Sequence, residues 1–185
     1  MPRSMGLILL LAVLPGAPAS AAMAPADRAA CEVWQRELAF ARSVQRHDAA
    51  AFAAFLAEDS VFDANADKPV RGPQAIVRHW TAILAGKAER LDWYPQHVVA
   101  SADGTLASSS GPYLFENRNA TTAARYTIGH FSTTWRRAPD GAWRVAFDGG
   151  DSGRPASDKE AAAFRRGRQH ACPRPVAVVL PTIRH

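Results

Sequence analysis

The sequence lacks an apolar run long enough to cross a membrane as a helix, which requires about 20 residues. Its N-terminal run, residues 6–14, ends before Pro15 at roughly half that length. The run follows Arg3 and precedes small residues that include an Ala-Ser-Ala triplet. This order is typical of a secretory signal peptide over residues 1–22. We therefore expect an exported chain, periplasmic or secreted, without stable membrane insertion.

Cysteine is equally scarce, because the chain contains only Cys31 and Cys172. Neither cysteine has metal-type spacing or an adjacent histidine, although His170 stands two positions before Cys172. In an exported chain, two cysteines favour one disulfide between the first helix and the C-terminal tail. Histidine, cysteine and carboxylate residues also form no cluster at ligand spacing. We therefore expect no metal and no other cofactor.

The formal charge of +5 is concentrated at one end of the chain. Residues 153–185 hold seven basic and two acidic side chains, a difference of +5, whereas residues 23–152 hold 14 basic and 15 acidic ones, a difference of −1. No segment matches a nucleic-acid-binding motif, so we expect no nucleic-acid partner. The basic tail is best interpreted as a solvated, charged helix face.

Apolar periodicity predicts three helices in the first half of the chain. Residues 29–46 carry an apolar stripe on one side of a helix. Asp48 is a good N-cap for a short second helix that includes Leu56, and Pro73 starts a third helix that runs to about Gly86. Residues 60–65, between the second and third helices, have the pattern of a strand.

The second half has the alternating pattern of strands, which we expect over residues 91–101, 106–116, 124–137 and 142–148. Ser157 and Glu160 then form the signature of a capping box, so residues 161–170 are expected to be helical. Helices followed by antiparallel strands indicate the α+β class. We expect a cone-shaped, curved antiparallel or mixed sheet, covered by the three N-terminal helices and enclosing a pocket.

From Cys31 to Ser152, this order of elements resembles the nuclear transport factor 2-like superfamily, nearest to its SnoaL-like and ketosteroid-isomerase-like bacterial branch. The strings that carry the resemblance are RHDAAAFAAFLAEDSVF, RGPQAIVRHW and PDGAWRVAFD. The resemblance implies one such domain over residues 23–152, after the signal peptide and before a basic C-terminal helix and tail at 153–185. It does not imply one activity, because members use the cone for different functions.

The resemblance does not extend to the groups used by steroid isomerase relatives. Those relatives hold an oxyanion with a tyrosine and an aspartic acid, and they abstract a proton with an aspartate. Alignment places Phe40, Thr133 and Ala64 at these three positions, with Asp63 one residue early. A one-residue step along a strand turns a side chain to the opposite face of the sheet. Steroid-type isomerase activity is therefore not expected.

The resemblance does imply an aromatic pocket. Trp80 falls where relatives place a pocket tyrosine, and the strand faces suggest further lining rings, from which we take Tyr113, Phe131 and Trp135 as ligand-binding. Phe115, Trp143 and Phe147 share the same pattern, and Trp143 and Phe147 are interpreted first as core residues.

Three polar residues are candidates for acid or base roles: His79, Asp63 and Asp148. His79 lies beside Trp80, although a partly exposed position on the helix flank is the preferred interpretation. Asp148, or Asp151 three residues later, is the best acidic candidate at the pocket mouth. The two glycines that follow Asp148 favour a strand end with loop chemistry, and this interpretation ranks ahead of a site.

Three functions stay open at the level of sequence. The first is an exported domain that binds a small apolar molecule without catalysis. The second is a cyclase- or dehydratase-type lyase, or an isomerase, in which His79 and either Asp148 or Asp63 act as acid and base. The third is an interaction module, because the outer face of the sheet commonly forms a homodimer in this superfamily.

Overall fold

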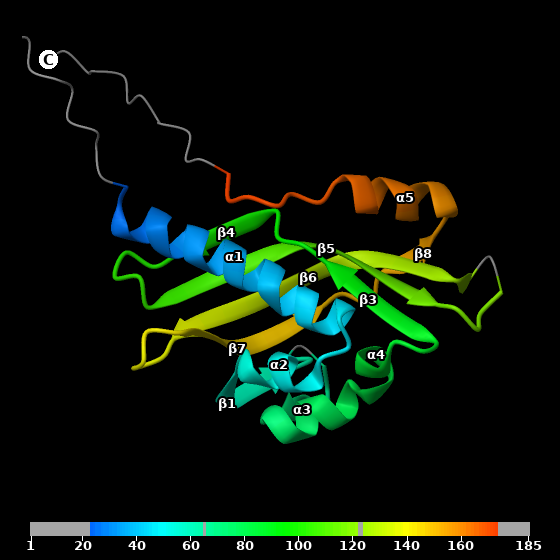
Figure 1. The fold of residues 1–185 in the computed structure, drawn as a ribbon, viewed down its shortest axis with the longest axis horizontal. Helices are drawn as coiled ribbons and strands as arrows, with labels where there is room; N and C mark the ends of the chain where they lie inside the picture. Colours follow the sequence, from blue (N-terminus) through cyan, green and yellow to red (C-terminus); the bar gives the residue numbers. More distant parts are fainter. Residues whose placement is uncertain (1–22, 65, 122–123, 174–185) are drawn as a thin grey trace, which may run out of the picture.

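The computed structural model describes residues 23–64, 66–121 and 124–173, and the expected signal peptide lies outside them. The long helix α1 lies along a curved mixed sheet, and three short helices gather at one end (Figure 1). This arrangement confirms the α+β cone. In chain order the elements are α1 (Pro25–Gln45), α2 (Ala49–Ala54), β1 (Leu56–Phe62), β2 (Val70–Arg71), α3 (Pro73–His79), α4 (Thr81–Ala85), β3 (Glu89–Trp93), β4 (His97–Ala100), β5 (Leu106–Asn117), β6 (Tyr126–Arg137), β7 (Trp143–Gly150), β8 (Arg154–Ala156) and α5 (Asp158–Arg166).

The sheet follows the order β2-β1-β7-β6-β5-β3, with β4 also paired to β5 and β8 to β6. β1 and β7 run parallel, whereas the other pairs are antiparallel. Long strands β5 and β6 form the centre of this sheet. Their curvature leaves an inner face that α1 covers only in part.

Several local signals fold as the sequence predicts. The Asp48 side chain accepts a hydrogen bond from the Ala51 N–H at 2.9 Å and caps α2. Ser157 and Glu160 form the reciprocal capping box of α5. Gly86 ends α4 in the left-handed region, with φ of 61°. A side chain at position 86 would also collide with the His47 ring, so glycine is required there.

Other boundaries differ from the prediction. Leu56 begins strand β1 instead of extending the second helix. The third helix is interrupted at Trp80, which separates α3 from α4. The single strand expected over 91–101 is two strands, β3 and β4, separated by a short segment around Pro95. Proline has no N–H to donate to a ladder, so the strand breaks there.

The largest difference concerns β7, because it contains a β-bulge. Thr134 pairs with Phe147 and Trp135 with Val145, which leaves Ala146 without a partner on β6. The extra residue reverses the alternation of inner and outer side chains beyond it. Val145 and Ala146 are both buried, whereas Phe147 is 49% exposed. The expectation that Phe147 belongs to the core is therefore wrong.

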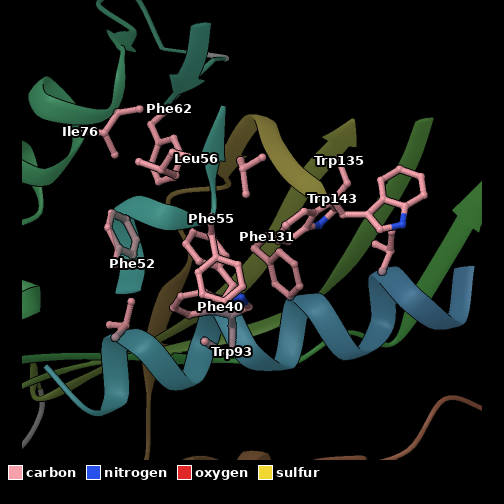
Figure 2. Packing of buried hydrophobic residues seen from close by; sticks show 14 of the residues in the cluster. Phe40, Phe52, Phe55, Leu56, Phe62, Ile76, Trp93, Phe131, Trp135 and Trp143 are labelled. Carbon is pink, nitrogen blue, oxygen red and sulfur yellow. The ribbon is translucent and has the colours of Figure 1, made fainter. Parts of the chain in front are cut away.

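An aromatic core lies between α1 and the sheet, with Phe40 at its centre (Figure 2). The Phe40 ring is fully buried and packs within 6.5 Å of the ring centres of five other aromatic residues, namely Phe52, Phe55, Phe62, Trp93 and Trp135. Trp143 is also buried, as expected for a core residue.

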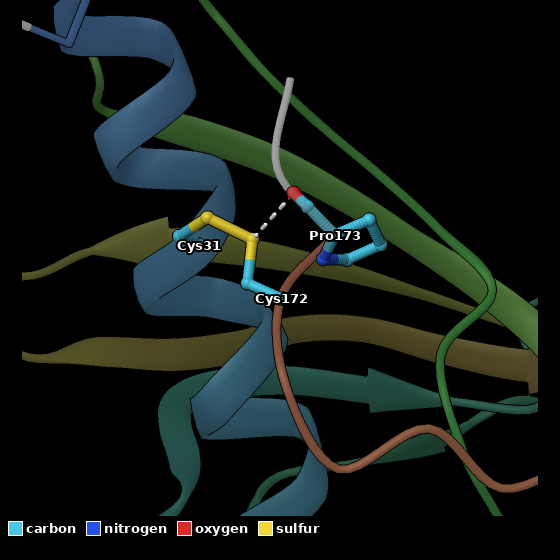
Figure 3. Close-up of a disulfide and its surroundings, with 3 residues drawn as sticks. All are labelled: Cys31, Cys172 and Pro173. Atoms are coloured by element: carbon cyan, nitrogen blue, oxygen red, sulfur yellow. Dashed lines mark hydrogen bonds between the residues drawn. A yellow bond between two sulfur atoms is a disulfide. The ribbon is translucent and has the colours of Figure 1, made fainter. Parts of the chain in front are cut away.

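Ring packing, a disulfide and an ion pair attach the C-terminal segment to the domain. Phe164 of α5 packs against Tyr94, with ring centres 4.9 Å apart. Cys172 then forms the predicted disulfide with Cys31 on α1, with Cα atoms 5.3 Å apart (Figure 3). Part of the basic charge of this segment is paired, since Arg168 lies 3.3 Å from Asp92.

Among the described residues, no helix has both the length and the apolar character needed to cross a membrane.

Candidate functional site

A cavity of about 380 Å³ opens on the inner face of the sheet, between the strands and Trp80. This volume lies within the range of small-molecule sites. Five aromatic residues and three aspartates contribute to its wall. The full lining is Asp63, Trp80, Leu91, Trp93, Tyr113, Phe115, Thr127, Phe131, Asp148, Gly149, Gly150, Asp151 and Ser152.

The aromatic wall is held in place by packing behind it. Trp80 stacks on Phe52 with ring centres 5.2 Å apart, and it meets Trp93 edge-on at 6.2 Å. Phe131 lies 6.5 Å from Trp93 on the sheet side. Because these three rings are supported by neighbouring rings, this part of the wall offers a preformed apolar surface to a planar or bulky apolar molecule.

Asp148, which lies within strand β7, contributes a carboxyl group to this wall. The bulge at Ala146 turns Asp148 inward, and the Thr133 hydroxyl lies 2.7 Å from its Oδ2 atom. Burial raises the pKa of Asp148 well above its usual value, the hydrogen bond from Thr133 acts in the opposite direction, and the charges of Glu37 and Asp63 raise the pKa further. The strand continues to Gly150, so the interpretation of Asp148 as a strand end is wrong.

A second carboxyl group, Glu37 of α1, lies fully buried behind the cavity. Its Oε1 atom accepts the Trp93 indole N–H at 2.6 Å, and its Oε2 atom accepts the Trp135 indole N–H at 2.8 Å. The Ser109 hydroxyl also donates to Oε2. Burial raises the pKa of Glu37, while these hydrogen bonds act in the opposite direction.

Asp63 and His79 form a pair near the mouth of the cavity. The His79 Nε2 atom lies 3.2 Å from Asp63 Oδ2, and both side chains are about half exposed. Asp63 follows the end of β1 with φ of 52°, so the alternation of a strand does not govern its direction. The prediction that Asp63 would turn to the opposite face is therefore wrong, since its side chain lines the cavity.

The opposite rim is fixed by Tyr113 and Asp151. The Tyr113 hydroxyl donates to the Asp151 carbonyl at 2.9 Å. The Asp151 carboxylate accepts the backbone N–H groups of His130 and Gly153, each at 3.0 Å. A Cβ atom at Gly129 would lie 2.2 Å from Asp151 Oδ1, so this close approach requires glycine. Burial raises the pKa of Tyr113, as does the nearby Asp151 charge.

The structure brings together most, but not all, of the residues expected at the pocket. Trp80, Tyr113 and Phe131 line the cavity with Asp63 and Asp148. Trp135 does not, because it is fully buried behind the wall and its indole N–H meets Glu37. His79 is not a lining residue in the described part of the chain, but it contacts Asp63, which is one. Among the described residues, no group of three or more His, Cys, Asp or Glu side chains could hold a metal ion.

Sequence reasoning missed Glu37 and Trp93. A signal for Glu37 was present, because it lies four residues after Val33 and three before Phe40, on the apolar stripe of α1. A carboxylate on the apolar face of a helix either is buried with that face or keeps that part of the face from packing against the core. The two aligned positions Phe40 and Thr133 are both fully buried, and neither is a lining residue in the described part of the chain.

Comparison with known proteins places the fold. A family model described as SnoaL-like domain matches residues 38–146. No curated protein matches the sequence. An NTF2-like protein of unknown function from Pseudomonas putida KT2440 is 18% identical with a TM-score of 0.55, over 71% of this chain and 95% of that one.

Two further solved structures share the fold at low identity. A proposed dehydratase of the NTF2-like family from Streptomyces avermitilis is 16% identical with a TM-score of 0.54, over 67% of this chain and 95% of that one. A ketosteroid isomerase-like protein from Erwinia carotovora atroseptica SCRI1043 is 15% identical with a TM-score of 0.52, over 67% and 95% of the two chains. At these identities the likeness concerns the fold.

Proposed function

Because this chain belongs to the SnoaL-like domain family, we propose that it is an exported domain whose cavity binds a small, mostly apolar molecule and holds one polar group of that molecule against Asp148. The observation that carries this proposal is the position of Asp148, a carboxyl group of raised pKa in an aromatic wall. A carboxyl group that keeps its proton can donate a hydrogen bond to a ligand oxygen.

The charge of the lining narrows the ligand class. The described lining residues include Asp63, Asp148 and Asp151 but no lysine or arginine. An anionic ligand would therefore enter an acidic site without a compensating cation. The proposed ligand is a neutral molecule with an apolar body and a hydrogen-bond acceptor such as a carbonyl oxygen.

The proposal of export is supported by the Cys31–Cys172 disulfide. Disulfides persist in oxidising compartments and are rare where thiols are kept reduced. The disulfide is thus compatible with a periplasmic or secreted location.

Ligand selectivity gives a direct test with two probes that share a naphthalene body, 2-acetylnaphthalene and 2-naphthoate. The neutral ketone is expected to bind, and the carboxylate is expected to bind at least about tenfold more weakly, a loss of about 1.4 kcal/mol. Quenching of tryptophan fluorescence reports binding, because Trp80 and Trp93 line the cavity. Preferential binding of the carboxylate would contradict the proposed ligand class.

Binding of the ketone should also depend on pH with a defined sign. The pKa of Asp148 is raised, so its O–H donor is present below that pKa and is lost as the pH rises through it. Affinity for 2-acetylnaphthalene is therefore expected to fall as the pH rises. Asp148→Asn should remove this dependence, because the amide N–H donates at any pH.

The matched control is Asp59→Asn, since Asp59 lies on β1 but is exposed and paired with Arg136. This variant should keep the pH dependence of the wild-type chain. If the Asp148→Asn variant kept the same dependence too, Asp148 would not be the group that meets the ligand.

A second candidate function, an acid–base isomerase or lyase, is favoured by the Asp63–His79 pair. An ionised Asp63 would take a proton from the carbon next to a ligand carbonyl, and the Asp148 O–H would donate its proton to the oxygen, giving an enol. Return of a proton to carbon completes an isomerisation, whereas loss of a neighbouring hydroxyl as water completes a dehydration. Asp63 and Asp148 line the same cavity, as this step requires.

Hydrogen exchange tests this second candidate with the same probe. In D₂O, the wild-type chain is expected to exchange the methyl protons of 2-acetylnaphthalene faster than buffer alone, as followed by proton NMR. Asp63→Asn should abolish the acceleration by removing the base, and His79→Ala should reduce it by freeing the Asp63 side chain. If the probe binds without accelerated exchange, the acid–base candidate is contradicted and only the binding function remains supported.

A further inference from the structure

The hydrogen bonds of Glu37 join α1 to three strands behind the cavity. Its Oε1 atom accepts the Trp93 indole N–H of β3 at 2.6 Å, and its Oε2 atom accepts the Trp135 indole N–H of β6 at 2.8 Å. The Ser109 hydroxyl of β5 donates to the same Oε2 atom. All four side chains are buried. Glu37 is thus the acceptor for two tryptophan N–H groups inside the core.

Trp93 lies between the core and the cavity. Its ring packs edge-on against Phe40 of the core, with ring centres 5.3 Å apart. The same ring lines the cavity beside Trp80 and Phe131. The indole N–H is the polar group of this side chain, and it can only donate. A buried N–H needs an acceptor, either in the core or from water or a ligand in the cavity. Glu37 supplies the acceptor from the core.

We propose that Glu37 is a positioning residue that holds the Trp93 indole N–H away from the cavity, so that Trp93 offers a ligand its ring surface and no hydrogen-bond donor. This part of the wall then selects for an apolar ligand body and favours placement of the ligand oxygen at Asp148. The selectivity rests on the proposed function. The direction of the Trp93 N–H does not, and it can be measured without any ligand.

Trp135 provides an internal comparison in the wild-type chain. It shares Glu37 with Trp93, but it is fully buried and is not among the described lining residues. Hydrogen exchange of the indole N–H groups, followed by nitrogen-15 NMR, should therefore show Trp93 as strongly protected as Trp135. The protection should be the same with and without 2-acetylnaphthalene. An N–H that faced the cavity would instead exchange faster than that of Trp135 in the empty cavity.

Glu37→Met tests the carboxyl group itself, because methionine keeps the length of the side chain and replaces the carboxyl group with an apolar thioether. The Trp135 N–H keeps a second acceptor, the Ser109 oxygen at 3.2 Å. The described residues offer the Trp93 N–H no such second acceptor. Trp93 is therefore expected to turn its N–H toward the cavity in this variant, and its N–H should lose protection relative to that of Trp135.

Two probes of the same shape test the consequence for selectivity. 2-Isopropenylnaphthalene has a CH₂ group where 2-acetylnaphthalene has its carbonyl oxygen, so it offers no acceptor. An N–H turned into the cavity adds a donor for the ketone alone. Glu37→Met should therefore raise the affinity for the ketone relative to the hydrocarbon by about threefold or more, the effect of one added hydrogen bond. A merely structural role of Glu37 would change both affinities by the same factor.

Glu32→Met is the matched control. Glu32 also lies on α1 and accepts a tryptophan N–H, that of Trp143 at 3.0 Å, but Trp143 is not among the described lining residues. This variant should move the indole resonance of Trp143. It should leave the protection of Trp93 and the ratio of the two affinities unchanged.

The proposal is overturned if the Trp93 N–H of the wild-type chain exchanges faster than that of Trp135, or if a folded Glu37→Met variant keeps the wild-type ratio of affinities. Should Glu37→Met fail to fold, the exchange measurement on the wild-type chain decides alone. If neither probe binds the wild-type chain, the proposed function is contradicted, whereas the exchange measurement still decides where the Trp93 N–H points.

Discussion

Loss of the Cys31–Cys172 disulfide is expected to lower the free energy of unfolding by about 2 to 5 kcal/mol. The two cysteines are 141 residues apart, so the bond closes nearly the whole described chain into one loop. In the chain-entropy model, a loop of this length restricts the unfolded ensemble by about 5 kcal/mol, and structure left in the unfolded chain reduces that figure. The link also returns the segment after α5 to α1.

Urea unfolding of the wild-type chain, with and without a reductant, measures this effect. The double variant Cys31→Ser with Cys172→Ser should have the lower stability of the reduced wild-type chain, and the reductant should not change it further. Amide hydrogen exchange should also show reduced protection of α5, because non-covalent contacts such as those of Phe164 and Arg168 then hold it without the covalent link. Equal stability of the oxidised and reduced chains would contradict the expectation.

The order of elements and several of their ends were predictable because each depends on local chemistry. Asp48 and Ser157 have side chains that cap a helix wherever one starts, and two cysteines in a chain expected to be exported leave one pairing. The resemblance and the α+β cone follow from the same order. The family model confirms the family over residues 38–146, and the arrangement of helices on the sheet confirms the cone. Local sequence signals were therefore enough to predict the helices and strands that surround the cavity.

The position of Asp148 was not predictable, because it depends on the β-bulge at Ala146. The sequence Trp143, Val145, Phe147 alternates perfectly, and a regular strand would bury all three on one face. The bulge arises from the pairing of β7 with β6, a contact between distant parts of the chain. It exposes Phe147 and turns Asp148 into the cavity. Because Ala146 is unpaired, the cavity wall contains the Asp148 carboxyl group instead of the Phe147 ring.

The other residues around the cavity show the same limit. Asp63 reaches the cavity because β1 ends at Phe62, and the end of a strand is the least predictable part of a strand. Glu37 could have been found from its place on the apolar stripe, but its partners could not. Trp93, Ser109 and Trp135 come from three different strands, which only the folded sheet brings together.

Replacing Phe40 by alanine is expected to lower the free energy of unfolding by about 3 to 5 kcal/mol. Phe40 is fully buried at the centre of the aromatic core, and the lost ring would leave a cavity that its five aromatic neighbours cannot close without giving up contacts with one another. Trp93 and Trp135 are two of those neighbours, and they also hold Glu37. Denaturant unfolding measures the loss, which is a large part of the stability of an ordinary domain.

Phe147→Ala is the matched control, because Phe147 is 49% exposed on the outer side of the bulge. The same chemical change there should alter the stability by no more than about 0.5 kcal/mol. The comparison also tests the bulge itself. If β7 alternated regularly, Phe147 would be a core residue and its loss would cost several kcal/mol, as at Phe40. Similar losses at the two positions would therefore contradict the register that turns Asp148 toward the cavity.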